Sequence, residues 1–242
     1  MIFLFFIIIN IIKMDKDRFI FYSKSANNKP GKNKGNNWSE YVSDNNKYKN
    51  LEETDNWRKM FSNFYESAFE LDGRKWNSVE HFFHAVKFRD LSGDKKNNNY
   101  EFYKTFSIDS KSPWSISPEL SKQAGKAGRI SAAGKIYDKK IEDKKIPKDV
   151  KLREDFYEGI DKKAMTIAFF AKFAQNPVLQ NVLLETHDAE LYHLVTERGK
   201  SSRLQLWDHL MRVRECIRKF KDTYDLSEVS KFPSEMIDRI LA

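Results

Sequence analysis

The stretch WNSVEHFFHAVKF, residues 76–88, decides the fold, because it superimposes two side-chain patterns on one predicted helix. Apolar residues recur in it at the i, i+3, i+4, i+7 spacing that lets one face of a helix pack onto a core. These residues are Val79, Phe82, Phe83 and Val86. The stretch therefore predicts an amphipathic helix that is anchored by its aromatic side chains.

Polar side chains occupy a second, narrower arc of the same helix. Glu80, His84 and Lys87 stand at i, i+4 and i+7 and border the apolar stripe, where side chains are half-buried. Ser78 is placed to cap the helix, and a carboxylate in the first turn is favourable for the helix dipole in any case. A solvated helix face explains three such groups equally well, so a functional role has to be argued from the rest of the chain.

Composition limits the classes of partner and of covalent structure. The 242 residues contain 43 Lys and Arg against 35 Asp and Glu, which gives a net charge of +8 and favours an anionic partner such as a nucleotide or nucleic acid. The single cysteine, Cys216, excludes an internal disulfide and a multi-cysteine zinc site. Cysteine usage fits a reducing compartment, and we expect a cytoplasmic protein.

The first thirteen residues contain the apolar run MIFLFFIIINII, which is too short to span a membrane. The run also lacks the basic leader and the cleavage site of a signal peptide. Met14 opens a normal soluble start, so we expect residues 1–13 to be an upstream extension of the reading frame that is not translated. A weak membrane anchor is the alternative; no stable membrane association is expected.

The first part of the chain predicts a strand, a polar insertion and a hairpin. FIFYS, residues 19–23, is typical of a strand, and residues 25–56 are rich in Asn, Lys and Gly, which indicates a loop or a disordered insertion. FEL and RKW flank Asp72 and Gly73, a dipeptide typical of a two-residue hairpin turn.

The remaining segments predict helices. Charged residues 136–149 suggest a surface excursion, and residues 221–242 suggest a C-terminal appendage. Helices are expected at 100–108, at 117–125 with Ser117 and Pro118 as start signals, at 152–175, from Pro177 to 186, and at 202–220. The predicted fold class is mainly α, with one domain over residues 18–220 and a small β-hairpin.

Several common catalytic and cofactor motifs are absent from the sequence. GKAGR, residues 125–129, lacks the spacing of a Walker A or dinucleotide-binding turn. His81 and His84 are three residues apart, but no third metal ligand stands at a recognisable spacing. We therefore expect no cofactor and no metal.

The order of the segments is more specific than any one of them. The chain reads FSNFY (61–65), FELDGRKWNSVEHFFHAVKF (69–88), SPELSKQAGKAGR (117–129), LREDFYEGIDKKAM (152–165), KFAQNPVLQNVLLET (172–186) and LMRVRE (210–215). This succession, over roughly residues 18–220, resembles the YbiA/NADAR superfamily. The resemblance implies a compact, mostly helical single domain that hydrolyses N-glycosidic bonds of ribosylated compounds.

The resemblance also implies a substrate class. Known activities of the family are cleavage of ribosylamino intermediates of riboflavin synthesis and removal of ADP-ribose from modified guanine. The expected partner is therefore a small ribosyl or ADP-ribosyl substrate, and ADP-ribosylated nucleic acid is a further candidate. Breaking a ribose C1–N bond builds positive charge on the sugar, which a nearby carboxylate stabilises.

Site residues are transferred position by position. Glu80 matches the family's glutamate and is the expected acid/base, and Lys87 matches its lysine, either to bind phosphate or to form a Schiff base with opened ribose. His84 stands where relatives commonly have Gln or Met. The other expected substrate-binding residues are Asn63, Phe64, Trp76, Arg129, Arg153 and Phe156. For Asn63 with Phe64, and for Trp76, a turn-capping or core role is the alternative.

The main departure from the family follows residue 186. Many relatives have an Asp-x-x-Trp-Gly loop there, whereas this chain reads HDAELYHLVTERGKSSRLQLWDHLM. His193, Arg198, Lys200 and Arg203 fall in this region and are expected to bind phosphate with a different geometry. The missing motif supports a second hypothesis, a binding module that retains an ADP-ribose pocket without turnover.

Overall fold

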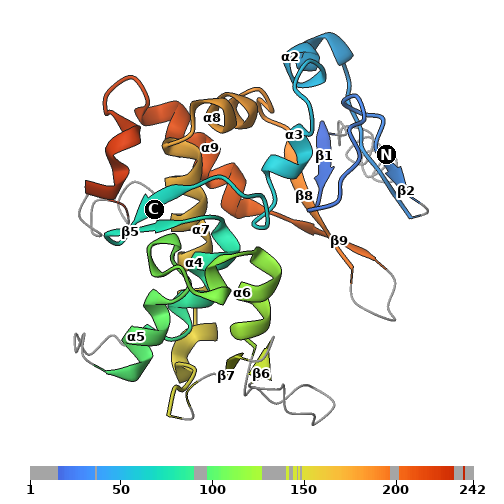
Figure 1. The fold of residues 1–242 in the computed structure, drawn as a ribbon. Coiled ribbons are helices and arrows are strands. Elements are labelled where there is room, and N and C mark those ends of the chain that lie inside the picture. Colours follow the sequence, from blue (N-terminus) through green and yellow to red (C-terminus); the bar gives the residue numbers. More distant parts are fainter. Residues whose placement is uncertain are drawn as a thin grey trace, which may run out of the picture.

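The computed structural model describes residues 16–35, 37–89, 97–126, 149–196 and 202–231, and a few positions outside these ranges (Figure 1). The strands are β1 (Arg18–Phe21), β2 (Lys34–Gly35), β3 (Trp38–Ser39), β4 (Phe69–Leu71), β5 (Arg74–Trp76), β6 (Lys140–Ile141), β7 (Lys144–Lys145), β8 (Glu190–Val195) and β9 (Arg203–Leu206). The α-helices are α2 (Lys49–Glu52), α3 (Trp57–Met60), α4 (Val79–Val86), α5 (Asn98–Lys104), α6 (Pro118–Ala124), α7 (Ile160–Ala174), α8 (Pro177–Leu184) and α9 (Asp208–Phe220). Short 3-10 helices are η1 (Asn45–Tyr48), η2 (Ile108–Ser110), η3 (Pro113–Ser115), η4 (Glu154–Tyr157) and η5 (Leu226–Lys231).

The β4–β5 hairpin and the helix after it form as the sequence predicts. Asp72 and Gly73 have φ of 57° and 66°, the two positive values that a tight primed hairpin turn needs. The Ser78 side chain then caps α4 by accepting a hydrogen bond from the backbone N–H of His81 at 3.4 Å. The hairpin therefore determines where α4 starts. Because Glu80 is in the first turn of α4, the hairpin also determines the position of Glu80.

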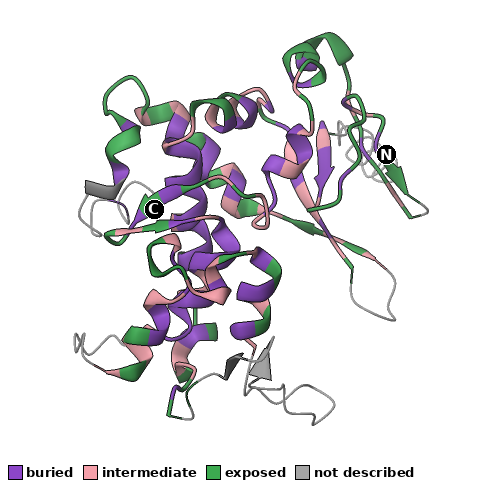
Figure 2. Ribbon diagram, viewed as in Figure 1, coloured by how far each residue is buried: buried purple, intermediate pink, exposed green. Residues whose placement is uncertain are grey.

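The centre of the molecule is α7, which lies between α4 and α9 (Figure 1). Its interior face is almost entirely buried, and Figure 2 shows buried residues concentrated along α4 and α7. The predicted helix over 152–175 is broken in the structure. Gly159 has φ of 115°, a left-handed conformation that interrupts an α-helix, so η4 precedes Gly159 and α7 begins at Ile160.

A three-stranded sheet replaces part of the helix that we expected at 202–220. β1 pairs in parallel with β8, and β8 pairs antiparallel with β9, in the order β1–β8–β9. RLQL, residues 203–206, forms a strand because its backbone pairs with β8. The helix therefore begins only at Asp208. Helices, including the 3-10 helices, form 47% of the described residues, so the expected mainly α class holds only in part.

The polar segment 25–56, expected to be a loop or a disordered insertion, packs against the sheet over its described residues. Tyr48 and Leu51 are fully buried in the core. Glu40 and Arg58 form a buried ion pair, with Arg58 Nη2 2.6 Å and Arg58 Nε 2.7 Å from the carboxylate oxygens. Glu40 also accepts a backbone N–H of β1 at 3.0 Å. Buried polar groups are satisfied by these bonds, which compensates for the small number of aliphatic residues.

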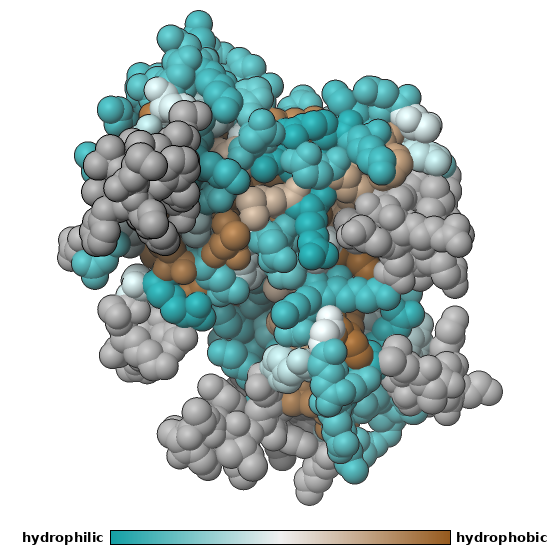
Figure 3. All heavy atoms as spheres, turned by 180° about the vertical axis from the view of Figure 1, so that it is seen from behind, coloured by the Kyte–Doolittle hydropathy of each residue, from teal (hydrophilic) through white to brown (hydrophobic). Residues whose placement is uncertain are grey.

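The described residues include no helix that is long and apolar enough to cross a membrane. Seen from behind, the surface is mostly hydrophilic, with small separate apolar patches (Figure 3). Our expectations for the N-terminal extension, for most of the 136–149 excursion and for the end of the C-terminal appendage fall outside the described residues.

Candidate functional site

Two segments that are distant in sequence meet at Glu80. The backbone N–H of Glu80 donates to the carbonyl oxygen of Asn63 at 2.9 Å, and the Asn63 side-chain amide donates to Glu80 Oε2. Glu80 is only 3% exposed. The turn after α3 and the first turn of α4 are thus joined by both main chain and side chain, which holds the carboxylate in one orientation.

His84 holds the other oxygen of the same carboxylate. Its Nε2 lies 2.9 Å from Glu80 Oε1, one helical turn away. Burial lowers the pKa of His84 to about 4, so the imidazole is neutral at pH 7 and Nε2 is assigned as the N–H donor. His84 Nδ1 is then a buried acceptor that bonds to no described residue. Gly125 leaves room for this ring, because a Cβ there would lie 2.0 Å from Nδ1.

Positive charge surrounds the carboxylate. Burial by itself would raise the pKa of Glu80, but the hydrogen bond from His84 and the positive charges of Lys122 and Lys87 act in the opposite direction, and the pKa lies below its ordinary value. The carboxylate is therefore ionised at neutral pH. An ionised carboxylate in a buried site can stabilise a developing cation or accept a proton, but it cannot donate one.

Lys87, at the end of α4, is 3% exposed and sits among aromatic rings. Its Nζ lies 5.1 Å from the ring centre of Phe83, 5.4 Å from that of Phe156 and 5.9 Å from that of Tyr157. Phe156 is itself buried and meets Phe83 edge-on. The predicted residue Phe156 therefore lies beside Lys87, where its ring restricts the position of the amine.

Lys122 joins the site from α6, and the sequence alone did not single it out. Its Nζ lies 4.9 Å above the ring of Phe64, and its charge acts on Glu80 and His84. The sequence signal that could have identified Lys122 is Gly125, one turn later, because a glycine at the end of a helix lets that helix approach another one closely.

His193 reaches the same region from β8. Burial lowers its pKa to about 4, with the charge of Glu80 acting in the other direction. Its ring stacks on Phe21 at 5.4 Å and lies 4.8 Å from the ring of Trp207. His193 Nδ1 and Trp207 Nε1 are both buried without a hydrogen-bond partner among the described residues. With His84 Nδ1 they are three polar atoms that a ligand could satisfy.

Two other predicted residues do not join this group. Trp76 is fully buried, and its indole N–H donates to the Leu71 carbonyl at 2.8 Å, so it has no open face for stacking and serves the core instead. The Arg153 guanidinium forms a bidentate hydrogen bond to the Asp155 carboxylate at 2.7 and 2.8 Å. The backbone N–H of Arg153 donates to the carbonyl oxygen of Lys87 at 2.9 Å. Arg129 lies outside the described residues, as do Arg198 and Lys200.

His81 and His84 point to different surroundings, although residues three apart lie on the same side of a helix. His81 Nδ1 lies 2.8 Å from Ser78 Oγ at the start of α4, and the His81 side chain is fully buried. His84 turns toward Glu80 instead. The pair therefore does not converge on a common ligand position.

A buried amine supports the turn that presents Asn63. Lys172 is fully buried in α7, and its Nζ donates to the carbonyl oxygens of Met60 and Ser62 at 2.9 and 3.1 Å. Burial lowers its pKa to about 7. The two carbonyls belong to the residues just before Asn63, so Lys172 fixes the approach of this turn to α4.

We expect Lys172→Met to lower the free energy of unfolding by roughly 1–3 kcal/mol, since two buried carbonyls lose their donor while the side chain keeps its length. Urea denaturation at pH 8 measures this change. Lys162→Met, on an exposed position of the same helix, is the matched control and should stay within about 0.5 kcal/mol of the wild type. Equal stability of the two variants would mean that the carbonyls do not depend on the amine.

Comparison with known proteins agrees with the segment order found in the sequence. The family model described as NADAR domain matches residues 50–197. Among solved structures, the NMR structure of the E. coli protein YbiA is similar at 22% identity and a TM-score of 0.45, over 69% of this chain and 82% of that chain. No curated protein matches the chain significantly. Because the family model spans more than half of the 242 residues, the chain belongs to the NADAR family.

Proposed function

We propose that this protein is an N-glycosidase that hydrolyses the ribose C1–N bond of an ADP-ribose conjugate or of a ribosylated riboflavin precursor. Membership of the NADAR family suggests activity of the N-glycosidase type. The observation that supports it best is the Glu80 carboxylate, which is buried and held by Asn63 and His84. Such a group is suited to a reaction that develops positive charge on a sugar.

The low pKa of Glu80 assigns its part in the reaction. As the C1–N bond breaks, the carboxylate stabilises the positive charge on the ribose and accepts a proton from the attacking water. The charges of Lys122 and Lys87 act on Glu80, and we assign these lysines to hold the phosphates of the substrate. The bare nitrogens of His84 and His193 are placed to accept hydrogen bonds from ribose hydroxyl groups.

Lys87 has a second route available. If the ribose ring opens, the amine of Lys87 can add to C1 after losing its proton, the base departs with its bonding electrons and a proton, and water later hydrolyses the Schiff base to release the sugar. The rings of Phe83 and Phe156 around the amine exclude water from this position. Both routes need Lys87, but only the second one needs it as a nucleophile.

We expect Lys87→Ala to lower turnover at least ~100-fold, because the variant loses the charge and the amine together. Lys87→Arg separates the two roles, since arginine keeps the charge and cannot form the Schiff base. Borohydride added during turnover should leave a ribose adduct on Lys87 that mass spectrometry detects. Near-normal turnover of Lys87→Arg without an adduct would assign Lys87 to phosphate binding only.

ADP-ribosylated guanine is the preferred substrate, ahead of the ribosylaminopyrimidine phosphate. The net charge of +8 and the two lysines beside Glu80 favour a substrate with several phosphate charges. The deciding experiment incubates the purified protein with an ADP-ribosylated guanine oligonucleotide and, separately, with the ribosylaminopyrimidine phosphate. Mass spectrometry then follows the release of ADP-ribose or of ribose phosphate. Release from neither substrate would contradict the proposed glycosidase.

A non-catalytic ADP-ribose-binding module is the second candidate. It is favoured by the β8–β9 hairpin, which stands where many relatives have the Asp-x-x-Trp-Gly loop. Such a module would bind ADP-ribose with equal affinity in the wild type and in Glu80→Gln, and it would hydrolyse neither substrate. Isothermal titration with ADP-ribose, run beside the turnover assay, separates the two functions.

A further inference from the structure

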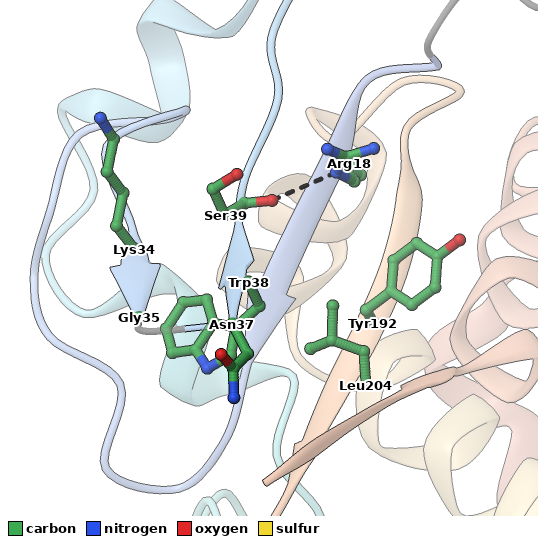
Figure 4. Close-up of a pocket in the computed structure, with 8 residues that line it drawn as sticks. All are labelled: Arg18, Lys34, Gly35, Asn37, Trp38, Ser39, Tyr192 and Leu204. Carbon is green, nitrogen blue, oxygen red and sulfur yellow. Dashed lines mark hydrogen bonds between the residues drawn. The ribbon is translucent and has the colours of Figure 1, made fainter.

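A hollow lies on the outer face of the β1–β8–β9 sheet (Figure 4). This outer groove has a volume of about 510 Å³. Arg18 and Tyr192 line it from β1 and β8, Leu204 lines it from β9, and the β2–β3 hairpin closes it with Lys34, Asn37 and Trp38.

The outer groove and the Glu80 site lie on opposite faces of the sheet. Tyr192 and His193 are neighbours in β8, and successive side chains of a strand point to opposite faces. His193 is turned to the side where Glu80 acts on it, whereas Tyr192 lines the groove. The groove is therefore not a part of the site around Glu80.

The side chains of the outer groove suit a flat heteroaromatic ligand. Trp38 and Tyr192 come from its two sides, and Leu204 lies between them (Figure 4). Both aromatic residues are partly exposed. Gly35 fixes the indole of Trp38, because a Cβ at Gly35 would lie 2.3 Å from the ring. A preset, partly exposed indole is a suitable platform for stacking a nucleobase.

The positively charged side chains of the outer groove are suited to binding phosphate. The Arg18 Nε donates to the Ser39 carbonyl at 3.1 Å, and no carboxylate of the described residues pairs with its guanidinium. Lys34 is exposed and likewise has no carboxylate partner in the described part of the chain. The surrounding residues 24–38 contain four lysines and no acidic residue, and one of these lysines, Lys29, is paired with Glu52. Glu190, which accepts the Tyr192 hydroxyl at 2.8 Å, is paired with Lys16.

We propose that the outer groove binds a single-stranded nucleic-acid segment. One base stacks between Trp38 and Tyr192 against Leu204, and Lys34 and Arg18 hold the flanking phosphates. A strand fits better than a free nucleotide, because the lysines continue past the groove along residues 24–34 and can follow a phosphate backbone. This binding needs no chemistry at Glu80 and does not depend on the proposed glycosidase activity.

Fluorescence anisotropy of the full chain with a labelled, unmodified 12-nucleotide single-stranded DNA tests the proposal. Trp38→Ala should weaken binding roughly 5- to 100-fold, the effect of losing one stacked base. Lys34→Ala should reduce the slope of log K against log salt by about 0.7, because one phosphate contact is lost. Lys75→Ala, on the exposed strand β5, is the matched control and should change neither quantity.

Two more conservative variants test the same proposal if Trp38→Ala fails to fold. Gly35→Ala retains the indole but displaces it, and it should weaken binding, whereas Tyr192→Phe retains the stacking ring and should bind like the wild type. Glu80→Gln should also bind like the wild type, which separates the groove from the catalytic proposal. The proposal is overturned if the wild type does not bind, if Trp38→Ala and Gly35→Ala both bind normally, or if AMP binds as tightly as the 12-mer.

Discussion

Glu80→Gln is expected to lower turnover of the ribosylated substrate at least ~100-fold, the size of effect that one acid/base group supplies. Glutamine has the shape of glutamate but removes the negative charge that would stabilise the developing ribose cation. Single-turnover assays with mass-spectrometric detection of the released sugar measure the effect. The loss should appear in kcat, because the charge on the sugar develops only in the transition state.

The fold of Glu80→Gln should remain intact, because the partners of the carboxylate can adapt. Asn63 can turn its amide so that the oxygen faces the new NH2 group, and His84 can change tautomer. Glu70→Gln removes the same charge at an exposed position of β4 and serves as the control. Unchanged turnover in Glu80→Gln, with active wild type, would remove Glu80 from the mechanism.

The second large effect is a loss of stability in acid. Burial lowers the pKa of His81, His84 and His193 to about 4, against 6.5 for a model histidine. Between these values the unfolded chain binds protons that the native state does not, so the free energy of unfolding falls as the pH falls from about 6.5 to about 4. Each histidine contributes roughly 3 kcal/mol over this range.

Urea denaturation at several pH values between 4 and 7 measures this effect. Three histidines predict a slope near pH 5 of about 4 kcal/mol per pH unit, and His81→Gln should reduce the slope by about one third. His81 is the suitable choice because its ring is hydrogen-bonded to Ser78 and not to the Glu80 carboxylate. Stability that is constant between pH 6.5 and pH 5 would contradict the burial of these rings as neutral groups.

Local signals in the sequence were sufficient to predict where several turns and helices begin. The Asp72–Gly73 turn, the Ser78 cap and the Ser117–Pro118 helix start each depend on residues within four positions, and the structure confirms all three. Pro177 likewise begins α8. Such signals act through backbone dihedral angles and neighbouring N–H groups, so they do not depend on the rest of the fold.

Sequence reasoning was wrong where pairing across the chain decides the outcome. Residues 203–206 continue a plausible helical pattern, yet they form β9 because β8 offers a hydrogen-bonding edge. The polar segment 25–56 has few aliphatic residues, but Glu40 and Arg58 order it through bonds to distant backbone groups. In both cases the deciding partner lies far away in sequence, and composition does not report on it.

The same division applies to the candidate site. By itself the sequence determined that Glu80, His84 and Lys87 share one side of a helix, because helical periodicity fixes their relative directions. Only the tertiary structure decided that Asn63 closes onto Glu80, that Lys122 arrives from α6 and that His193 arrives from β8. It also decided that Trp76 is buried in the core. The physical reason is that burial and charge at one carboxylate depend on every element packed around it, and no local pattern encodes that packing.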